Sequence, residues 1–132
     1  MPELLLDTHI ALWASFDDER LSPRARELIQ APTNEIWVSA ASIWEIAIKS
    51  SLGKLPAAIT AAQAAVVFRL SGYQMLPVEA KHALLVESLP TFANHKDPFD
   101  RMLIAQVMSE AMVLLTEDAL LPQYGKTYVL GA

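Results

Sequence analysis

Five acidic side chains in this sequence stand beside short apolar segments or at the start of predicted helices. They are Asp7, Glu45, Asp97, Asp100 and Asp118. Carboxylates packed together repel one another, which raises their pKa values, and a divalent cation removes the repulsion. Because all of these ligands would be oxygen atoms, the set favours Mg²⁺ or Mn²⁺. A cation of this kind can activate water and stabilise an in-line displacement at phosphorus.

A zinc site is not expected. The chain has no cysteine, and its three histidines, His9, His82 and His95, are dispersed along the sequence. Zinc sites in proteins use cysteine or closely spaced histidine ligands.

The elements that must position the acids alternate between short apolar strands and helices. Strands are expected at residues 3–7, 35–40, 73–78, 111–116 and 128–130. Helices are expected at residues 8–15, from Ser22 and Pro23 onward, and at 41–52, 57–70, 79–88 and 98–110. This alternation predicts an α/β fold, with a mostly parallel sheet covered by helices on both faces. We expect one domain spanning residues 1–132.

The acids are expected to meet at one edge of this sheet. Asp7 and Asp118 follow two of the strands, and Glu45 lies one turn into the helix after another. Asp97 and Asp100 open the helix that precedes the strand at 111–116. In open α/β sheets, ligand sites lie outside the carboxyl ends of the strands.

Each acid also has a purely structural interpretation. Helix N-caps would account for three of them, Asp7, Asp97 and Asp118, and an acid in the first helical turn would account for Asp100. Glu45 stands three residues after Ser42, the spacing of a capping box, and four before Lys49, the spacing of a helical ion pair. These interpretations must together explain why all of the acids gather at one sheet edge.

Composition limits the remaining possibilities. Of 132 residues, 53% are hydrophobic and 19% are charged, which excludes a disordered chain. The longest uncharged run, residues 55–68, is too short to span a membrane, and the first residues lack the basic segment of a signal peptide. Without cysteine no disulfide framework exists, so a reducing compartment, most simply the cytoplasm, is expected.

The net charge of −5 argues against a nucleic-acid binder at first sight. Outside the five acids, however, 10 acidic and 10 basic residues balance each other. Four basic residues flank the predicted site and are candidates for phosphate contacts, with solvated surface charges as the alternative: Lys49, Lys54, Lys96 and Arg101.

Aromatic and histidine side chains near the acids have two interpretations. His9 could approach a substrate or be a partly buried structural histidine, and the second is favoured. The three tryptophans could stack on bases if exposed. Because Trp13, Trp37 and Trp44 each fall within an apolar pattern, we expect them in the core.

Four segments of the sequence resemble the PIN-domain family, and within it the VapC-type toxins of bacterial toxin–antitoxin pairs. The segments are Leu4–His9, Ser39–Ile46, His95–Gln106 and Leu114–Asp118. They come in the order of the family motifs and extend over nearly the whole chain.

The resemblance implies a Mg²⁺- or Mn²⁺-dependent endoribonuclease. Asp7 and Asp100 match the first and third acids of the family and should ligate the metal. Glu45 and Asp118 match the second and fourth acids and should complete the site directly or through water. The role of Asp97, which belongs to a variant of the third motif, is open. Thr116 should orient Asp7 or Asp118 through a hydrogen bond.

The resemblance also implies partners, namely an RNA substrate, a VapB-type antitoxin that covers the site, and a second copy of the chain in a homodimer. The alternative from another class is a catalytically idle module that works by binding a protein partner. A phosphotransfer enzyme of the haloacid-dehalogenase type is not favoured. Such an enzyme would need an Asp two residues after Asp7, where the chain has His9.

Overall fold

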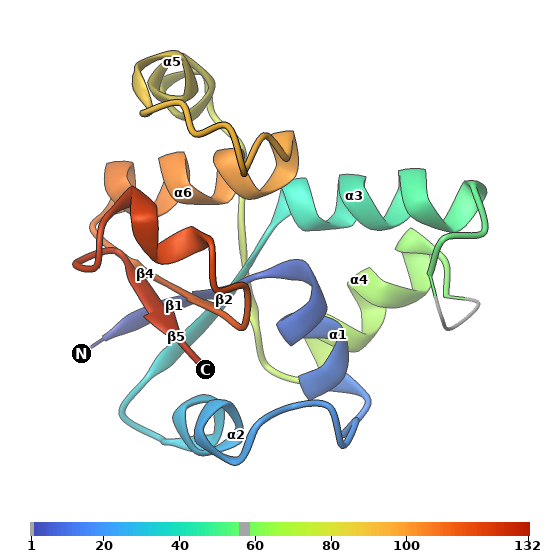
Figure 1. The fold of residues 1–132 in the computed structure, drawn as a ribbon. Helices are drawn as coiled ribbons and strands as arrows, with labels where there is room; N and C mark the ends of the chain where they lie inside the picture. Colours follow the sequence, from blue (N-terminus) through green and yellow to red (C-terminus); the bar gives the residue numbers. More distant parts are fainter. Residues whose placement is uncertain (1, 56–58) are drawn as a thin grey trace.

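The computed structural model describes residues 2–55 and 59–132. It contains a five-stranded sheet whose paired strands are all parallel, in the order β3-β2-β1-β4-β5 (Figure 1). The strands are β1 (Glu3–Leu6), β2 (Glu35–Ser39), β3 (Gln74–Leu76), β4 (Val113–Thr116) and β5 (Val129–Gly131). The helices are α1 (Thr8–Ser15), α2 (Pro23–Gln30), α3 (Ala40–Ser51), α4 (Ala61–Leu70), α5 (Ala80–Ser88), α6 (Pro98–Glu110) and the 3₁₀ turn η1 (Leu121–Tyr124).

The first strand of the chain is the middle strand of the sheet. Residues Leu4–Leu6 pair with Ile36–Val38 of β2 on one side and with Val113–Leu115 of β4 on the other. The chain builds outward through β2 and β3 and then crosses to β4 and β5, so the strand order reverses between β1 and β4. Ligand sites of open α/β sheets lie at such a reversal, beyond the carboxyl ends of the strands.

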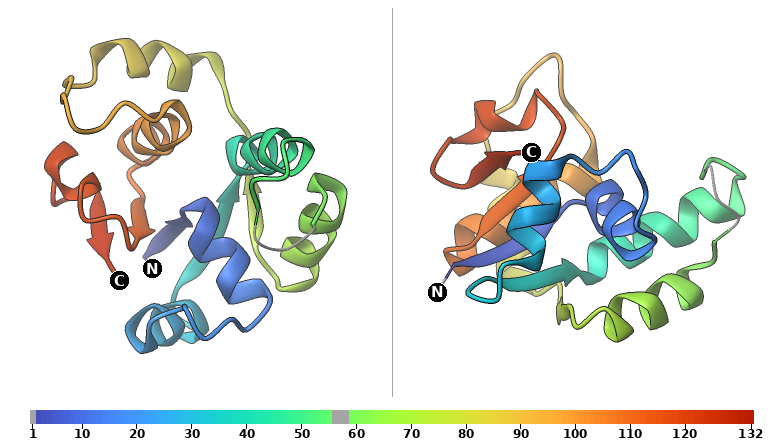
Figure 2. Two further views of the ribbon diagram at one scale, coloured as in Figure 1. Left: turned by 45° about the vertical axis from the view of Figure 1, so that its right-hand side comes forward. Right: turned by 90° about the horizontal axis from the view of Figure 1, so that it is seen from below.

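Helices cover both faces of the sheet, as the sequence predicts. Successive side chains of β1 point to opposite faces, so Leu4 and Leu6 belong to one core cluster and Leu5 to the other. The first cluster takes its helical residues mainly from α1, α2 and α4, and the second mainly from α6 and η1. Figure 2 shows these layers in two further views.

Helix α3 contributes to both clusters through Ala41 and Ile46. Behind its first turn, the buried Ser39 hydroxyl caps α3 at Ala41 and donates to Gln106 Oε1 of α6 at 2.6 Å. Gln106 Nε2 donates in turn to the Pro77 carbonyl oxygen at 3.2 Å. One buried amide therefore joins α6 to the start of α3 and to the segment after β3.

Two helices begin where the sequence predicts because their first residues carry strong signals. Helix α2 begins at Pro23 with Ser22 as its N-cap, and α6 spans the predicted residues 98–110 with Asp97 as its N-cap. Helix α1 likewise covers the predicted residues 8–15.

The prediction of a helix over 57–70 is wrong at its start. Thr60 and Gln63 form a capping box, so α4 begins at Ala61, and Ile59 and Thr60 are not helical. Residues 57 and 58 of that prediction lie outside the described residues. The strand expected from residue 111 begins at Val113, because Ala111 ends α6 with a left-handed φ of 55°.

Helix α5 lies on the outer side of α6, away from the sheet (Figure 1). None of the helices in the described part of the chain combines the length and the hydrophobicity needed to cross a lipid bilayer.

Candidate functional site

All five predicted acids line one cavity of about 280 Å³. Asp7 directly follows β1, and Asp118 stands two residues after β4. Glu45 projects from α3, while Asp97 and Asp100 stand at the start of α6. The other lining residues are Thr8, His9, Ile10, Trp13, Lys49 and Glu117. The expected meeting of the acids beyond the carboxyl ends of the strands is therefore present in the structure.

Asp7 is 8% exposed, and both of its carboxylate oxygens are held. Oδ1 accepts a hydrogen bond of 2.9 Å from the Ile10 amide, which makes Asp7 the N-cap of α1. Oδ2 accepts from the Thr116 hydroxyl, and Thr116 Oγ1 itself accepts from the Asp118 amide at 3.0 Å. The hydrogen bond predicted for Thr116 is thus present, and it connects the ends of β1 and β4.

Glu45 is 3% exposed and also has a partner for each oxygen. The Thr8 hydroxyl donates to Oε1 at 2.6 Å, and Lys49 forms an ion pair with Oε2. The alternative of a capping box from Ser42 is wrong, because Ser39 caps α3 and Ser42 lies inside the helix. The Ser42 hydroxyl instead lies 2.9 Å from that of Thr8.

Asp97 and Asp100 have different surroundings although they are three residues apart. Asp97 Oδ1 accepts from the amides of Phe99 and Asp100 at 2.9 and 3.0 Å, which caps α6. Asp100 Oδ2 lies 3.1 Å from Nε2 of His95. The capping interpretation of Asp97 therefore holds, and Asp97 lines the cavity as well.

His95 is a residue of this site that the sequence did not indicate. It is 6% exposed, and its Nδ1 lies 2.8 Å from the Tyr124 hydroxyl. Arg101 donates to the same hydroxyl at 3.1 Å. A chain of hydrogen bonds thus runs from Arg101 through Tyr124 and His95 to Asp100.

The guanidinium of Arg101 therefore binds groups of the protein itself, and this removes Arg101 from the residues predicted to contact phosphate. Besides Tyr124, its guanidinium donates to the carbonyl oxygens of Pro90 at 2.9 Å and Val86 at 3.3 Å. Of the three lysines proposed for the same role, Lys49 lines the cavity, whereas Lys54 and Lys96 are exposed outside its lining.

Burial and mutual repulsion shape the electrostatics of the cavity. Burial raises the pKa of Asp7, and the charge of Glu45 raises it further, while hydrogen bonds from Ile10 and Thr116 oppose the change. Burial, followed by the charge of Asp97, raises the pKa of Asp100 to about 6. The carboxylates therefore lack full compensation from the protein.

Lys49 supplies part of the missing positive charge. Partial burial alone would lower the pKa of Lys49, but Glu45, Asp97 and Asp100 together raise it above its usual value. The lysine accordingly remains an ammonium ion beside the acids.

The donor set suits a divalent cation. Asp100 and Asp118 each offer a carboxylate oxygen, and these atoms lie within 4.8 Å of each other. Both nitrogens of the neighbouring His95 are in hydrogen bonds, so His95 orients Asp100 and is not itself a ligand. Asp7, Glu45 and Asp97 line the same cavity with further oxygen atoms. A carboxylate-rich cavity in which the pKa values of Asp7 and Asp100 are raised is an environment that Mg²⁺ or Mn²⁺ would stabilise.

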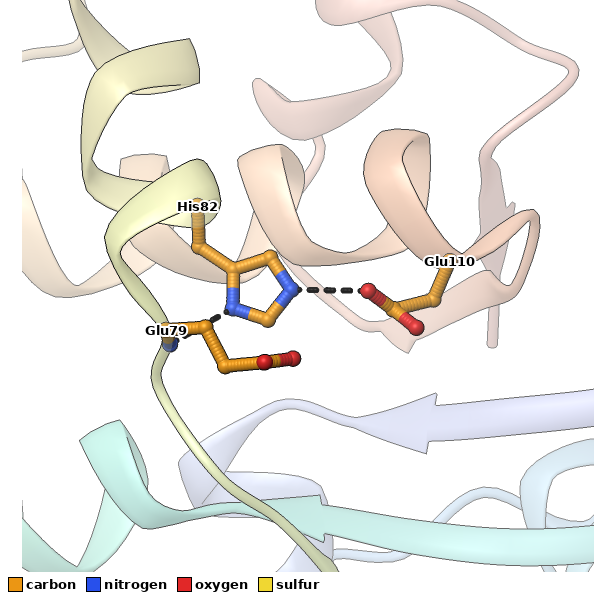
Figure 3. Close-up of side chains that lie close together, drawn as sticks. All are labelled: Glu79, His82 and Glu110. Atoms are coloured by element: carbon orange, nitrogen blue, oxygen red, sulfur yellow. Dashed lines mark hydrogen bonds and ion pairs between the residues drawn. The ribbon is translucent and has the colours of Figure 1, made fainter.

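A second group of possible metal ligands lies between α5 and α6, and two of its three side chains already have hydrogen-bond partners in the protein (Figure 3). It consists of Glu79, His82 and Glu110. His82 Nδ1 accepts from the Glu79 amide at 3.0 Å, so Nε2 carries the proton and donates to Glu110 Oε2 at 2.9 Å. Lys81 Nζ lies 2.8 Å from the same oxygen. These contacts join α5 to α6. Both ring nitrogens of His82 are in hydrogen bonds, so neither is available to bind a metal.

Two expectations about ring side chains are wrong. His9 is exposed and lines the acidic cavity, so it is not a buried structural histidine. Trp44 is 58% exposed and packs edge-on against Phe99 with a centroid distance of 4.9 Å, so it is not a core residue. Trp13 and Trp37 are half-buried and pack against the two core clusters.

Comparisons with known proteins agree with this architecture. The family model described as "PIN domain" matches residues 4–126. Ribonuclease VapC22 of Mycobacterium tuberculosis is 30% identical over 127 residues, which cover 89% of this chain and 88% of that protein.

Solved structures share the fold at lower identity. VapBC2 from Rickettsia felis, bound to a promoter DNA fragment, has a TM-score of 0.72 at 16% identity and covers 98% of both chains. DNA-bound VapBC from Salmonella typhimurium has a TM-score of 0.68 at 16% identity, covering 99% of this chain and 98% of that one. The domain match, the identity to a VapC protein and the shared sheet show that this chain belongs to the PIN-domain family and resembles its VapC-type members.

Proposed function

We propose that this protein is a Mg²⁺- or Mn²⁺-dependent endoribonuclease and the toxin of a VapBC-type pair. The observation that carries the proposal is the meeting of Asp7, Glu45, Asp100 and Asp118 in one cavity at the sheet reversal. A relative named as a ribonuclease, matched over 89% of the chain, supports the same activity.

In this proposal Asp7 and Asp100 hold the cation, and Glu45 and Asp118 complete its surroundings directly or through water. The bound cation would activate water and stabilise negative charge on the phosphodiester. Glu45, which Thr8 and Lys49 hold in place, or Asp118 would orient the attacking water and take its proton. Thr116 would keep Asp7 aligned, and Asp97 would cap α6 and add a carboxylate to the wall of the cavity.

Lys49 gives the substrate a positive contact within the acidic cavity. Its side chain is 27% exposed, and its ammonium group is paired with Glu45. An ammonium group in this place would attract a phosphate oxygen of RNA and so offset the repulsion between the substrate and the acids.

The proposal of a VapC-type toxin also implies binding partners. We propose a VapB-type antitoxin that covers the acidic cavity, a homodimer of the toxin, and a cytoplasmic location. The relatives in the solved structures are described as VapBC complexes, and this supports the antitoxin proposal for the present chain.

The decisive experiment is RNA cleavage by the purified, partner-free protein with Mg²⁺, Mn²⁺ or EDTA. Discrete cutting that EDTA stops, and that Asp100→Asn lowers in kcat by at least about 100-fold, supports the proposal. Asp17→Asn is the matched control, because Asp17 is 82% exposed and has a φ of 50°. Asparagine adopts such a left-handed backbone readily.

Intact RNA in both metals would contradict the nuclease assignment. Binding of a protein partner by such an inactive chain would instead favour the catalytically idle module.

A further inference from the structure

A smaller cavity of about 90 Å³ adjoins the acidic one. Its walls include Leu12, Phe16 and Arg20, and it shares His9 and Trp13 with the acidic cavity. Phe16 is 53% exposed, so its ring is open to a ligand at the wall of this cavity. This smaller cavity, which we call the aromatic cavity, is therefore a direct neighbour of the acidic cavity.

One helix generates this arrangement. His9, Trp13 and Phe16 follow one another at spacings of four and three residues, so they lie on one face of α1 and its C-cap. The row covers about 10 Å along the axis, at about 1.5 Å per residue. Because Asp7 caps the same helix, the row begins beside the acids and leads away from them.

The aromatic cavity is uncharged overall. The Arg20 guanidinium lies over the Trp13 ring, 5.4 Å from its centroid. Asp18 binds that guanidinium through both carboxylate oxygens, at 3.0 and 2.7 Å. Since the charges of Arg20 and Asp18 cancel, the cavity suits a flat, uncharged group better than a phosphate.

We propose that this aromatic cavity binds a nucleobase of single-stranded RNA next to the phosphodiester held at the acids. The inference rests on the proposed function and adds a base subsite to it. A base is flat and uncharged, and it stacks on aromatic rings and on guanidinium planes. The shared walls at His9 and Trp13 place such a base beside the site of cleavage.

The test compares steady-state cleavage of one mapped single-stranded RNA by wild type, Phe16→Ala and Phe16→Tyr. Loss of stacking removes binding that is the same before and during reaction, so Phe16→Ala should raise KM about 5-fold or more with little change in kcat. Phe16→Tyr should retain the wild-type KM. Leu84→Ala is the matched control, because Leu84 is 69% exposed on α5 and is not in the lining of either cavity.

A second substrate that lacks the base beside the cleaved bond identifies the group that is bound. Wild type should cut this abasic RNA with a KM about 5-fold or more above that of the intact RNA. Phe16→Ala should show a smaller KM difference between the two substrates than wild type, since the contact between Phe16 and the base is already lost.

Three results would overturn the proposal. EDTA-sensitive cutting with the same KM in wild type and Phe16→Ala removes the base subsite but leaves the nuclease assignment intact. Unchanged RNA kinetics together with weaker inhibition by a co-expressed cognate antitoxin assigns the cavity to the protein partner. A wild type that cuts no RNA removes both the nuclease and the subsite.

Discussion

At the scale of single residues, hydrogen bonds to neighbouring groups fix the orientation of carboxylates in the cavity. Asp7 is both a helix cap and a member of the acidic cluster, because Oδ1 faces the Ile10 amide and Oδ2 faces Thr116. Capping and metal binding use different lone pairs of one carboxylate, so the structural and functional interpretations of Asp7 are compatible. The same holds for Asp97, which caps α6 and lines the cavity.

Tyr124→Phe tests whether the chain of hydrogen bonds behind Asp100 positions that acid. The change removes the hydroxyl group that lies 2.8 Å from His95 and 3.1 Å from Arg101. Loss of such an outer partner typically weakens metal sites by about 10-fold or more. We expect the Mg²⁺ concentration for half-maximal cleavage to rise by that factor, as measured by metal titration.

Tyr128→Phe is the control for this measurement, because Tyr128 is half-buried and is absent from the lining of the acidic cavity. If Tyr124→Phe loses thermal stability but keeps the wild-type Mg²⁺ dependence, Tyr124 is structural only.

At the scale of elements, sequence reasoning succeeds where the signal is local. The Ser22–Pro23 pair and the Asp97–Pro98 pair each fix the start of a helix, and both predictions are confirmed. The helix predicted from residue 57 begins later, at Ala61. The side chains of Thr60 and Gln63 each accept a hydrogen bond from the backbone amide of the other, and this capping box sets the start of the helix. A high alanine content favours a helix but does not indicate where it begins.

The sequence predicts only part of the site, because some contacts in the site join residues that are far apart in the sequence. The acids follow from their places beside strands, because parallel strands end at one edge. His95 and Tyr124 are 29 residues apart, and their contact depends on how η1 packs against α6, which no local pattern encodes. The exposure of Trp44 was missed because its apolar neighbours on α3 resemble a buried pattern.

Gln106→Leu tests the buried amide that joins three elements. The change leaves the Ser39 hydroxyl and the Pro77 carbonyl oxygen without their partner. We expect the free energy of unfolding to fall by about 2 kcal/mol, as measured by urea denaturation. Gln30→Leu, at the exposed end of α2, should change it by no more than about 0.5 kcal/mol. Equal losses in the two variants would show that the amide has no special role.

At the scale of the whole molecule, the acidic cavity reduces the stability of the metal-free protein near neutral pH. The pKa of Asp100 is about 6 in the folded chain, against an ordinary value of 3.8. Between these values the folded state binds more protons than the unfolded state, so stability falls as pH rises from about 4 to about 6. The loss is at most about 3 kcal/mol.

Thermal unfolding in EDTA at pH 5 and pH 7.5 measures this effect. Wild type should lose more stability between pH 5 and pH 7.5 than Asp100→Asn, whose pH dependence gives the change caused by all other groups, and Asp17→Asn should behave like wild type. Asp100→Asn should lack most of this extra loss, because it has no charge to bury at that position. A wild-type curve parallel to that of Asp100→Asn would contradict the raised pKa.

Adding Mg²⁺ or Mn²⁺ at pH 7.5 should reverse the loss, since a ligand that binds only the folded state stabilises it more as its concentration rises above Kd. The unfolding temperature of wild type should rise by a few degrees at saturating metal. Asp100→Asn should show little or no rise, whereas Asp17→Asn should respond like wild type.

The contact between Thr116 and Asp7 spans 109 residues of sequence. During synthesis, the growing chain therefore carries Asp7 and Glu45 long before, and Asp100 shortly before, it carries β4, the strand that brings Thr116 to Asp7. Pairings across such long loops form slowly, because the entropy of closing the loop must be overcome first. The acidic cavity is thus completed only when almost the whole chain has left the ribosome, and a product interrupted before Val113 holds three of the four acids without the neighbouring strand that aligns them.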